Sequence, residues 1–155
     1  MPCRGAGRFG RLAVPVFHDE ATYHFELGKG EQITEGNDIA IIATGLMVNE
    51  ALIAAKTLAE KGIHARVINI CTIKPIDEEL LLASAGKTGK VVTAEEHSVI
   101  GGLGSAVAET LSRRCPTRQV YVGIQDCFGE SGKARDVLKK YGLTAEAIVD
   151  ACLLA

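Results

Sequence analysis

The sequence predicts an α/β fold, a three-layer α/β/α sandwich with a sheet of about five strands between two layers of helices. Short apolar runs alternate with amphipathic segments about every 25 residues, which is the spacing of right-handed βαβ units. Aromatic residues make up only 5% of the chain and Trp is absent, so the core must consist of Ile, Leu, Val and Ala. Such a core is typical of a parallel sheet covered by helices.

Continuous apolar runs bounded by turn residues predict the buried strands. The clearest run is Ile39–Thr44, which ends at Gly45. The others span residues 65–70, 91–94 and 119–124. Looser alternation through Tyr23–Leu27 predicts a further short strand, which we expect on a sheet edge.

Apolar residues at helical spacing predict helices between these strands. The helix from Val48 to Lys61 is followed by Gly62, as expected of a helix C-terminus. Asp77 is predicted to cap the next helix, because its side chain can accept hydrogen bonds from the first turn. Further helices are expected at residues 105–114, 133–141 and 144–151.

A chain of 155 residues that is 47% hydrophobic suits one domain with one core. We expect residues 1–38 to form an arm that leads into a domain at residues 39–155. A net charge of −2 without a basic face argues against a nucleic-acid partner. No apolar run approaches the roughly 20 residues of a membrane span. Five isolated cysteines without a CxxC pair predict a reduced, cytoplasmic protein.

The most informative segment is Glu95–Gly104, which joins a predicted strand to a predicted helix. It places Glu95, Glu96 and His97 at the carboxyl end of a strand, where open parallel sheets meet ligands and partner domains. A carboxylate beside an imidazole can serve acid–base chemistry or bind a metal. Consecutive strand residues point in different directions, so the three side chains cannot converge on one ion. Interface or structural use is therefore favoured, and no catalytic or metal-binding residue is predicted.

Three glycines, Gly101, Gly102 and Gly104, complete this turn. A helix N-terminus attracts anions, so a phosphate could bind here. The spacing is neither GxGxxG nor that of a Walker A loop, and tight packing of the helix against the strand explains the glycines equally well. The residues alone leave both interpretations open.

A second polar loop, from Asp126 to Gly132, follows the last predicted strand and should lie near the same sheet edge. Ser131 has no His–Asp arrangement nearby in the sequence, so its predicted role is to cap the helix that begins near Lys133. Cys127 is expected to be a buried or half-buried, inert thiol.

Four segments, in this order, resemble the C-terminal domain of transketolase: Gly36–Gly45, Ile68–Asp77, Glu95–Gly104 and Asp126–Gly132. The pattern is most similar to the split transketolases, whose halves are separate polypeptides. The resemblance implies a Rossmann-like sandwich whose mixed sheet contains an antiparallel strand. It also implies that residues 1–38 are the tail of a pyrimidine-binding domain followed by a linker.

The family transfers a two-carbon ketol unit between phosphorylated sugars, using thiamine diphosphate and Mg²⁺. The resemblance implies that missing domains bind both, because the Gly-Asp-Gly segment that holds them is absent here. We therefore expect no cofactor in this chain, no activity in isolation, a partner that carries the thiamine-binding N-terminal domains or subunit, and a homodimer. By the same resemblance, Arg11 falls on the arginine that grips the sugar phosphate, with Arg8 beside it.

Other functions stay open at this point. A stand-alone regulatory module could bind an anion or a nucleotide at the Gly101–Gly104 turn. The equivalent domains of deoxyxylulose-phosphate synthase and of the β subunits of 2-oxo acid dehydrogenases look similar but less close.

Overall fold

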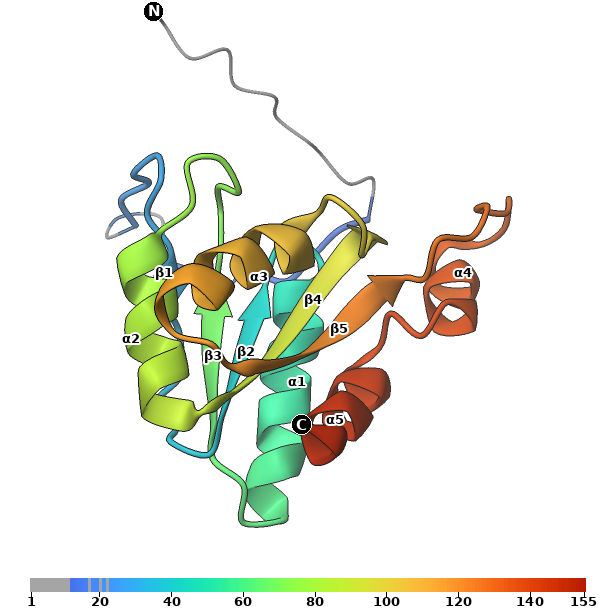
Figure 1. Cartoon of the computed structure of the whole chain (residues 1–155). Helices are drawn as coiled ribbons and strands as arrows, with labels where there is room; N and C mark the ends of the chain where they lie inside the picture. The colour runs from blue at the N-terminus through green and yellow to red at the C-terminus, as the bar shows by residue number, and fades with distance from the viewer. Residues whose placement is uncertain (1–11, 17, 20, 22) are drawn as a thin grey trace, which may run out of the picture.

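In the computed structural model, five strands form one mixed sheet with helices on both faces (Figure 1). The structure describes residues 12–16, 18–19, 21 and 23–155. The strands lie in the order β1-β3-β2-β4-β5, and β1 is antiparallel to its neighbour while the others run parallel. Their bounds are β1 (Glu31–Gln32), β2 (Ile39–Ala43), β3 (Ala65–Asn69), β4 (Lys90–Ser98) and β5 (Arg118–Ile124). The predicted mixed α/β sandwich is confirmed.

Two helices cover each face of the sheet, and a short one follows the last strand. On one side α1 (Met47–Glu60) and α5 (Ala145–Leu154) share a hydrophobic cluster with the strands. On the other side α2 (Glu78–Thr88) and α3 (Leu103–Arg114) share a second cluster. The short helix α4 (Ala134–Lys140) lies beyond the end of β5 (Figure 1).

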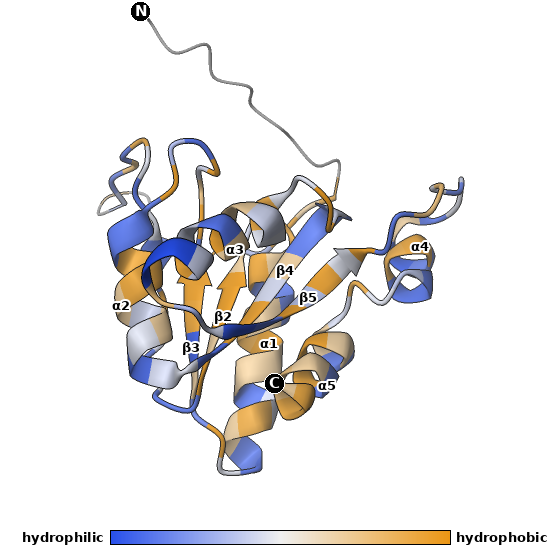
Figure 2. Ribbon diagram, in the orientation of Figure 1, coloured by the Kyte–Doolittle hydropathy of each residue, from blue (hydrophilic) through white to orange (hydrophobic). Residues whose placement is uncertain are grey.

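The central strand β2 explains why its sequence reads as an unbroken apolar run. Ile39, Ile41 and Ala43 join the cluster beneath α1 and α5, whereas Ala40 and Ile42 join the cluster beneath α2 and α3. Because helices cover both faces of this strand, all of its residues are buried and its sequence does not alternate between polar and apolar residues. Coloured by hydropathy, the central strands are largely apolar and the helices turn their polar residues outward (Figure 2).

The predicted edge strand at Tyr23–Leu27 is wrong, because the edge strand is β1, a few residues later. Tyr23, Phe25 and Leu27 are 41%, 53% and 63% exposed, so their alternation has no buried face to match. β1 is held instead by pairing of Glu31 with Asn69 and by the buried Arg66, whose guanidinium donates to Gln32.

Residues 31–38, which belong to the segment predicted to be an arm, therefore pack against the domain. Arg66 Nε also donates to the Gly36 carbonyl at 3.2 Å, and the Thr34 hydroxyl donates to the Ala65 carbonyl at 3.0 Å. The domain boundary at residue 38 stays a prediction.

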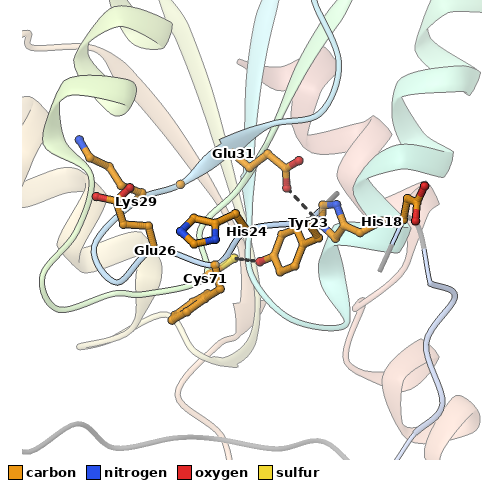
Figure 3. A pocket seen from close by; sticks show the side chains of 10 residues that line it. His18, Tyr23, His24, Glu26, Lys29, Glu31 and Cys71 are labelled. Atoms are coloured by element: carbon orange, nitrogen blue, oxygen red, sulfur yellow. Dashed lines mark hydrogen bonds and ion pairs between the residues drawn. The ribbon is translucent and has the colours of Figure 1, made fainter. Parts of the chain in front are cut away.

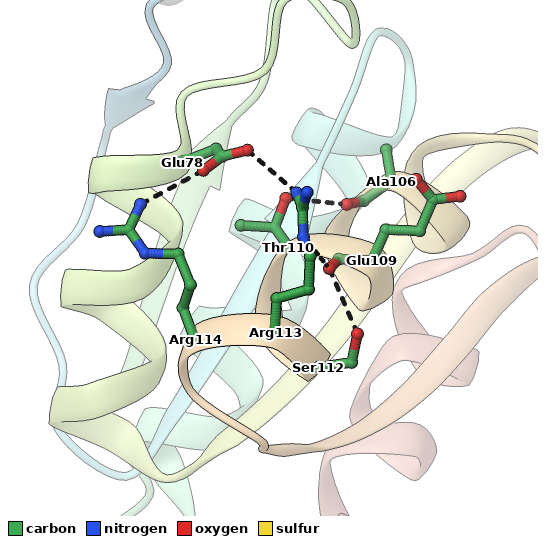
Figure 4. Close-up of polar contacts among 7 residues, drawn as sticks. All are labelled: Glu78, Ala106, Glu109, Thr110, Ser112, Arg113 and Arg114. Atoms are coloured by element: carbon green, nitrogen blue, oxygen red, sulfur yellow. Dashed lines mark hydrogen bonds and ion pairs between the residues drawn. The ribbon is translucent and has the colours of Figure 1, made fainter.

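The two helices of the second layer are also bridged by charge. Glu78, in the first turn of α2, accepts hydrogen bonds from Arg113 at 3.2 Å and from Arg114 at 3.3 Å, both in the last turn of α3 (Figure 4). All three side chains are exposed, so this cluster contributes little stability beside the apolar packing beneath it.

Asp77 caps α2, as predicted, and it also binds the segment of chain that precedes β1. One carboxylate oxygen accepts from Leu80 N at 3.1 Å, which closes the first turn of the helix. The other accepts from Gly30 N at 3.1 Å, across 47 positions of sequence. Asp77 is only 8% exposed, so both backbone donors would lose their partner in a buried place if the carboxylate were removed.

Replacement of Asp77 by Ala should therefore lower the free energy of unfolding by about 1–2 kcal/mol, the usual cost of losing a helix cap and leaving a donor unpaired. Urea denaturation followed by circular dichroism would measure this loss. Glu79→Ala is the matched control, because the Glu79 side chain is 88% exposed. Equal losses in the two variants would contradict the dual role of Asp77.

Candidate functional site

The turn from β4 into α3 is organised around the buried carboxylate of Glu95. This side chain is 2% exposed. Its Oε2 accepts from Leu103 N at 2.7 Å and its Oε1 accepts from Gly104 N at 2.8 Å. These donors belong to the first turn of α3, where the helix dipole favours a negative charge. The carboxylate thus closes the helix N-terminus from inside the domain.

The glycines of the turn permit this close approach. A Cβ at Gly102 would lie 2.7 Å from Glu95 Cδ and 2.8 Å from the Ser98 carbonyl oxygen. A Cβ at Gly104 would lie 2.7 Å from Tyr121 Cε1, in β5. Both contacts are far too short, so only glycine fits. Of the two interpretations that the sequence left open, tight packing is the one that the geometry supports.

An anion-binding role for this turn does not fit the structure. The N–H groups of Leu103 and Gly104 are already paired with Glu95, and Gly101 N donates to Ser105 Oγ at 2.8 Å. A phosphate or diphosphate would have to approach a buried carboxylate of the same sign. The geometry therefore argues against the alternative of a regulatory module that binds anions at Gly101–Gly104.

Glu96 and His97 do not join Glu95. Both side chains are exposed, and His97 Nδ1 lies 3.2 Å from the Ser98 carbonyl oxygen. Within the described part of the chain, no hydrogen bond or ion pair links the imidazole to either carboxylate. The turn therefore forms no acid–base pair. Glu96 and His97 instead stand at the surface of the carboxyl edge of the sheet, where the predicted interface role remains to be tested.

The loop after β5 projects from the same edge. Asp126 has a backbone φ of 48° and its N–H donates to the Ile124 carbonyl at 3.0 Å. The Tyr141 hydroxyl donates to the Phe128 carbonyl at 2.8 Å, and Lys140 pairs with Glu130 at 2.5 Å. Among the residues that the structure describes, Asp126 and Ser131 make no hydrogen bond to the Glu95–Gly104 turn. The two segments share an edge but not a site.

Two expectations for this loop are wrong. Ser131 does not cap α4, because the residue that precedes the helix is Lys133 and no side chain caps it. Ser131 lies two positions too early for its hydroxyl to reach the first turn. Cys127 is exposed rather than buried, because the loop points away from the core.

A hollow of about 320 Å³ lies between residues 18–19 and 23–31 on one side and Cys71, which follows β3, on the other (Figure 3). The Tyr23 hydroxyl lies 3.8 Å from Cys71 Sγ, and the rings of His18 and Tyr23 stack at 4.2 Å. Burial and the contact with Cys71 raise the pKa of the Tyr23 hydroxyl. No pattern in the sequence indicates this hollow, because the residues that line it are far apart along the chain.

Neither a metal site nor a membrane segment is found in the described residues. No three His, Cys, Asp or Glu side chains there gather closely enough to hold an ion. No helix there has the length and apolar character needed to cross a membrane. Arg8 and Arg11, the expected phosphate-binding residues, lie outside the described residues.

The pairing of Glu95 with α3 makes a sharp prediction about stability. Glu95→Ala should lower the free energy of unfolding by about 2–4 kcal/mol, because it leaves two helix donors buried without a partner. Glu95→Gln should lose less, since one amide oxygen still accepts a hydrogen bond. Chemical denaturation measures both.

Glu96→Ala, one position along the chain and exposed, is the control and should change stability by no more than about 0.5 kcal/mol. An unchanged stability in Glu95→Ala would show that the carboxylate does not hold the helix.

Comparison with known proteins agrees with this architecture. The family model of the transketolase C-terminal domain matches residues 28–148. A 6-deoxy-6-sulfo-D-fructose transketolase subunit from Clostridium sp. (strain MSTE9) is 55% identical over 141 residues, which are 91% of this chain and 43% of that protein. A 1-deoxy-D-xylulose-5-phosphate synthase from Geobacter sulfurreducens is 43% identical over 150 residues, 96% of this chain and 23% of that protein.

Among solved structures, a split-gene transketolase in an inactive β4 tetramer superposes with a TM-score of 0.88 at 53% identity, over 92% of this chain and 46% of that one. A Pichia stipitis transketolase mutant gives 0.64 at 26% identity, over 82% of this chain and 18% of that one. The chain thus spans less than half the length of these relatives. The matching fold, the four sequence segments and the family model together show that the chain belongs to the family of transketolase C-terminal domains.

Proposed function

We propose that this chain serves as the C-terminal domain of a thiamine-diphosphate-dependent transketolase, and that it assembles the enzyme while other domains bind the cofactor and Mg²⁺. The observation that carries this proposal is the engagement of Glu95 with the N-terminus of α3. Among the described residues, that helix start is the best candidate for holding a diphosphate, and its donors already serve an internal carboxylate. The turn does not fit the cofactor, so its role is structural.

The transferred ketol unit would then be handled by protein that this chain does not include. More than half the length of the transketolase subunit from Clostridium sp. lies outside the matched region. We place thiamine diphosphate, Mg²⁺ and the choice of sugar in the thiamine-binding N-terminal domains or subunit, which this chain does not include. Arg8 and Arg11 would lend phosphate contacts from the segment that joins the two parts. The assembled enzyme would be a dimer in the cytoplasm.

A second candidate has a specific observation in its favour. Several 1-deoxy-D-xylulose-5-phosphate synthases are 39–43% identical to most of this chain. The 55% identity to a transketolase subunit favours ketol transfer between sugars. One reaction mixture can distinguish the two functions, because it can be tested both for ketol transfer between sugar phosphates and for formation of 1-deoxy-D-xylulose 5-phosphate.

The proposal predicts that the chain gains a function only when it is reconstituted. The purified 155-residue chain should bind no thiamine diphosphate in isothermal titration with Mg²⁺, and should show no ketol transfer alone. Mixed with the separately expressed thiamine-binding portion of a split transketolase, it should restore transfer between sugar phosphates.

The thiamine-binding portion by itself is the control. Tight, stoichiometric binding of the cofactor by the isolated chain would overturn the division of labour proposed here. Full activity of the thiamine-binding portion without this chain would overturn its role in assembly. Formation of 1-deoxy-D-xylulose 5-phosphate by the mixture would favour the second candidate.

A further inference from the structure

Phe128 is the most exposed large apolar side chain in the described structure, at 98%. A phenylalanine left in water forgoes roughly 2 kcal/mol that burial would contribute. The loop that carries it is nevertheless tied to the C-terminal end of α4. The Phe128 carbonyl accepts from the Tyr141 hydroxyl at 2.8 Å, and Glu130 pairs with Lys140 at 2.5 Å. The domain therefore presents this ring outward, as interfaces present an aromatic anchor.

Other exposed apolar side chains lie in segments at the same end of the sheet. The loop after β3 carries Ile73, which is 38% exposed, and the loop after β4 carries Ile100, which is 64% exposed. Because these strands are parallel to β5, their carboxyl ends lie along one edge of the sheet. β4 is the neighbour of β5 in the sheet, whereas β3 is separated from β5 by β2 and β4, and the loop after β3 stands on the other side of that edge from the loop after β5 (Figure 1). We call Ile100 and Phe128, on the loops that follow the neighbouring strands β4 and β5, the carboxyl-edge surface.

Residues 23–27 lie on the other side of the edge, because contacts tie them to the end of β3. The Tyr23 hydroxyl lies 3.8 Å from Cys71 Sγ, and Gly28 N donates to Thr72 Oγ1 at 2.8 Å. Large exposed apolar side chains on two neighbouring loops are what an interaction surface presents. In the rest of the described residues, apart from the entering segment, large exposed apolar side chains lie on the β3 side of the edge, on α1 (Ile53) and on α5 (Leu153 and Leu154).

The direction of the chain indicates what covers the carboxyl-edge surface. The first described segment enters the domain at this edge (Figure 1), and it carries Val14 and Val16, which are 48% and 88% exposed. Protein that precedes the domain in a longer relative would therefore meet the domain here. Those relatives extend over more than twice the matched length.

We propose that the carboxyl-edge surface, with Phe128 as its anchor, docks against the thiamine-binding portion of the enzyme. This inference rests on the proposed function and adds the surface and the residue through which assembly takes place. Glu96 and His97, exposed at the same edge, would form part of the polar rim around the apolar contact.

The test measures binding of the full chain to the separately expressed thiamine-binding portion of a split transketolase by isothermal titration. Phe128→Ala should weaken binding at least tenfold, as expected for an anchor. Phe128→Tyr should retain binding within about threefold, because the ring is kept. Ile53→Ala, on the outer face of α1, is the matched control and should leave binding unchanged.

Thermal unfolding provides the folding control, since a side chain that is 98% exposed should not affect the melting temperature when it is truncated. If wild-type chain restores ketol transfer and Phe128→Ala binds equally well, the surface assignment is overturned while the proposed function stands. If wild-type chain neither binds nor restores transfer, both fail. Loss of self-association, seen by light scattering, with unchanged binding to the thiamine-binding portion would assign the surface to a second copy and also overturn this inference.

Discussion

The hydrogen bonds from Leu103 and Gly104 to the buried carboxylate of Glu95 fix the geometry on which the second half of the fold depends. A charge that is 2% exposed is tolerated only where donors meet it, and the start of α3 supplies two donors and a favourable dipole. The glycines at 102 and 104 follow from this pairing, because any side chain there would strike Glu95 or Tyr121. A motif that resembles a binding site is thus a packing device.

The pairing of Glu95 with α3 leaves one buried and two exposed polar side chains at the carboxyl end of β4. Glu95 faces inward and is fully engaged, whereas Glu96 and His97 are left at the surface. Both oxygens of Glu95 are paired with backbone donors inside the fold, so the groups that this edge offers to a ligand or a partner are the exposed ones. The outward ring of Phe128 gives this edge an exposed aromatic group of the kind that interfaces bury. A domain with this surface is suited to complete a larger enzyme.

Much of the fold was predictable because burial leaves a strong mark on sequence. Ile39–Ala43 is covered on both faces and is apolar throughout, and Asp77 precedes its helix as a cap should. The edge strand was misplaced because Glu31–Gln32 is too short to show any periodicity. The exposure of Cys127 and the uncapped start of α4 were missed because a loop's direction depends on distant contacts, here with Tyr141.

The sequence by itself determined the alternation of the four parallel strands with helices and the apolar core, because periodicity and turn residues are local properties. Four of its segments also carried the resemblance to transketolase C-terminal domains. It could not decide whether the Glu95–Gly104 segment binds an anion or packs against itself. Only the tertiary structure decided this, by bringing Glu95 onto the backbone of residues 103 and 104 and Tyr121 onto Gly104. Those contacts join separate elements, and their distances arise only when β4, α3 and β5 are assembled.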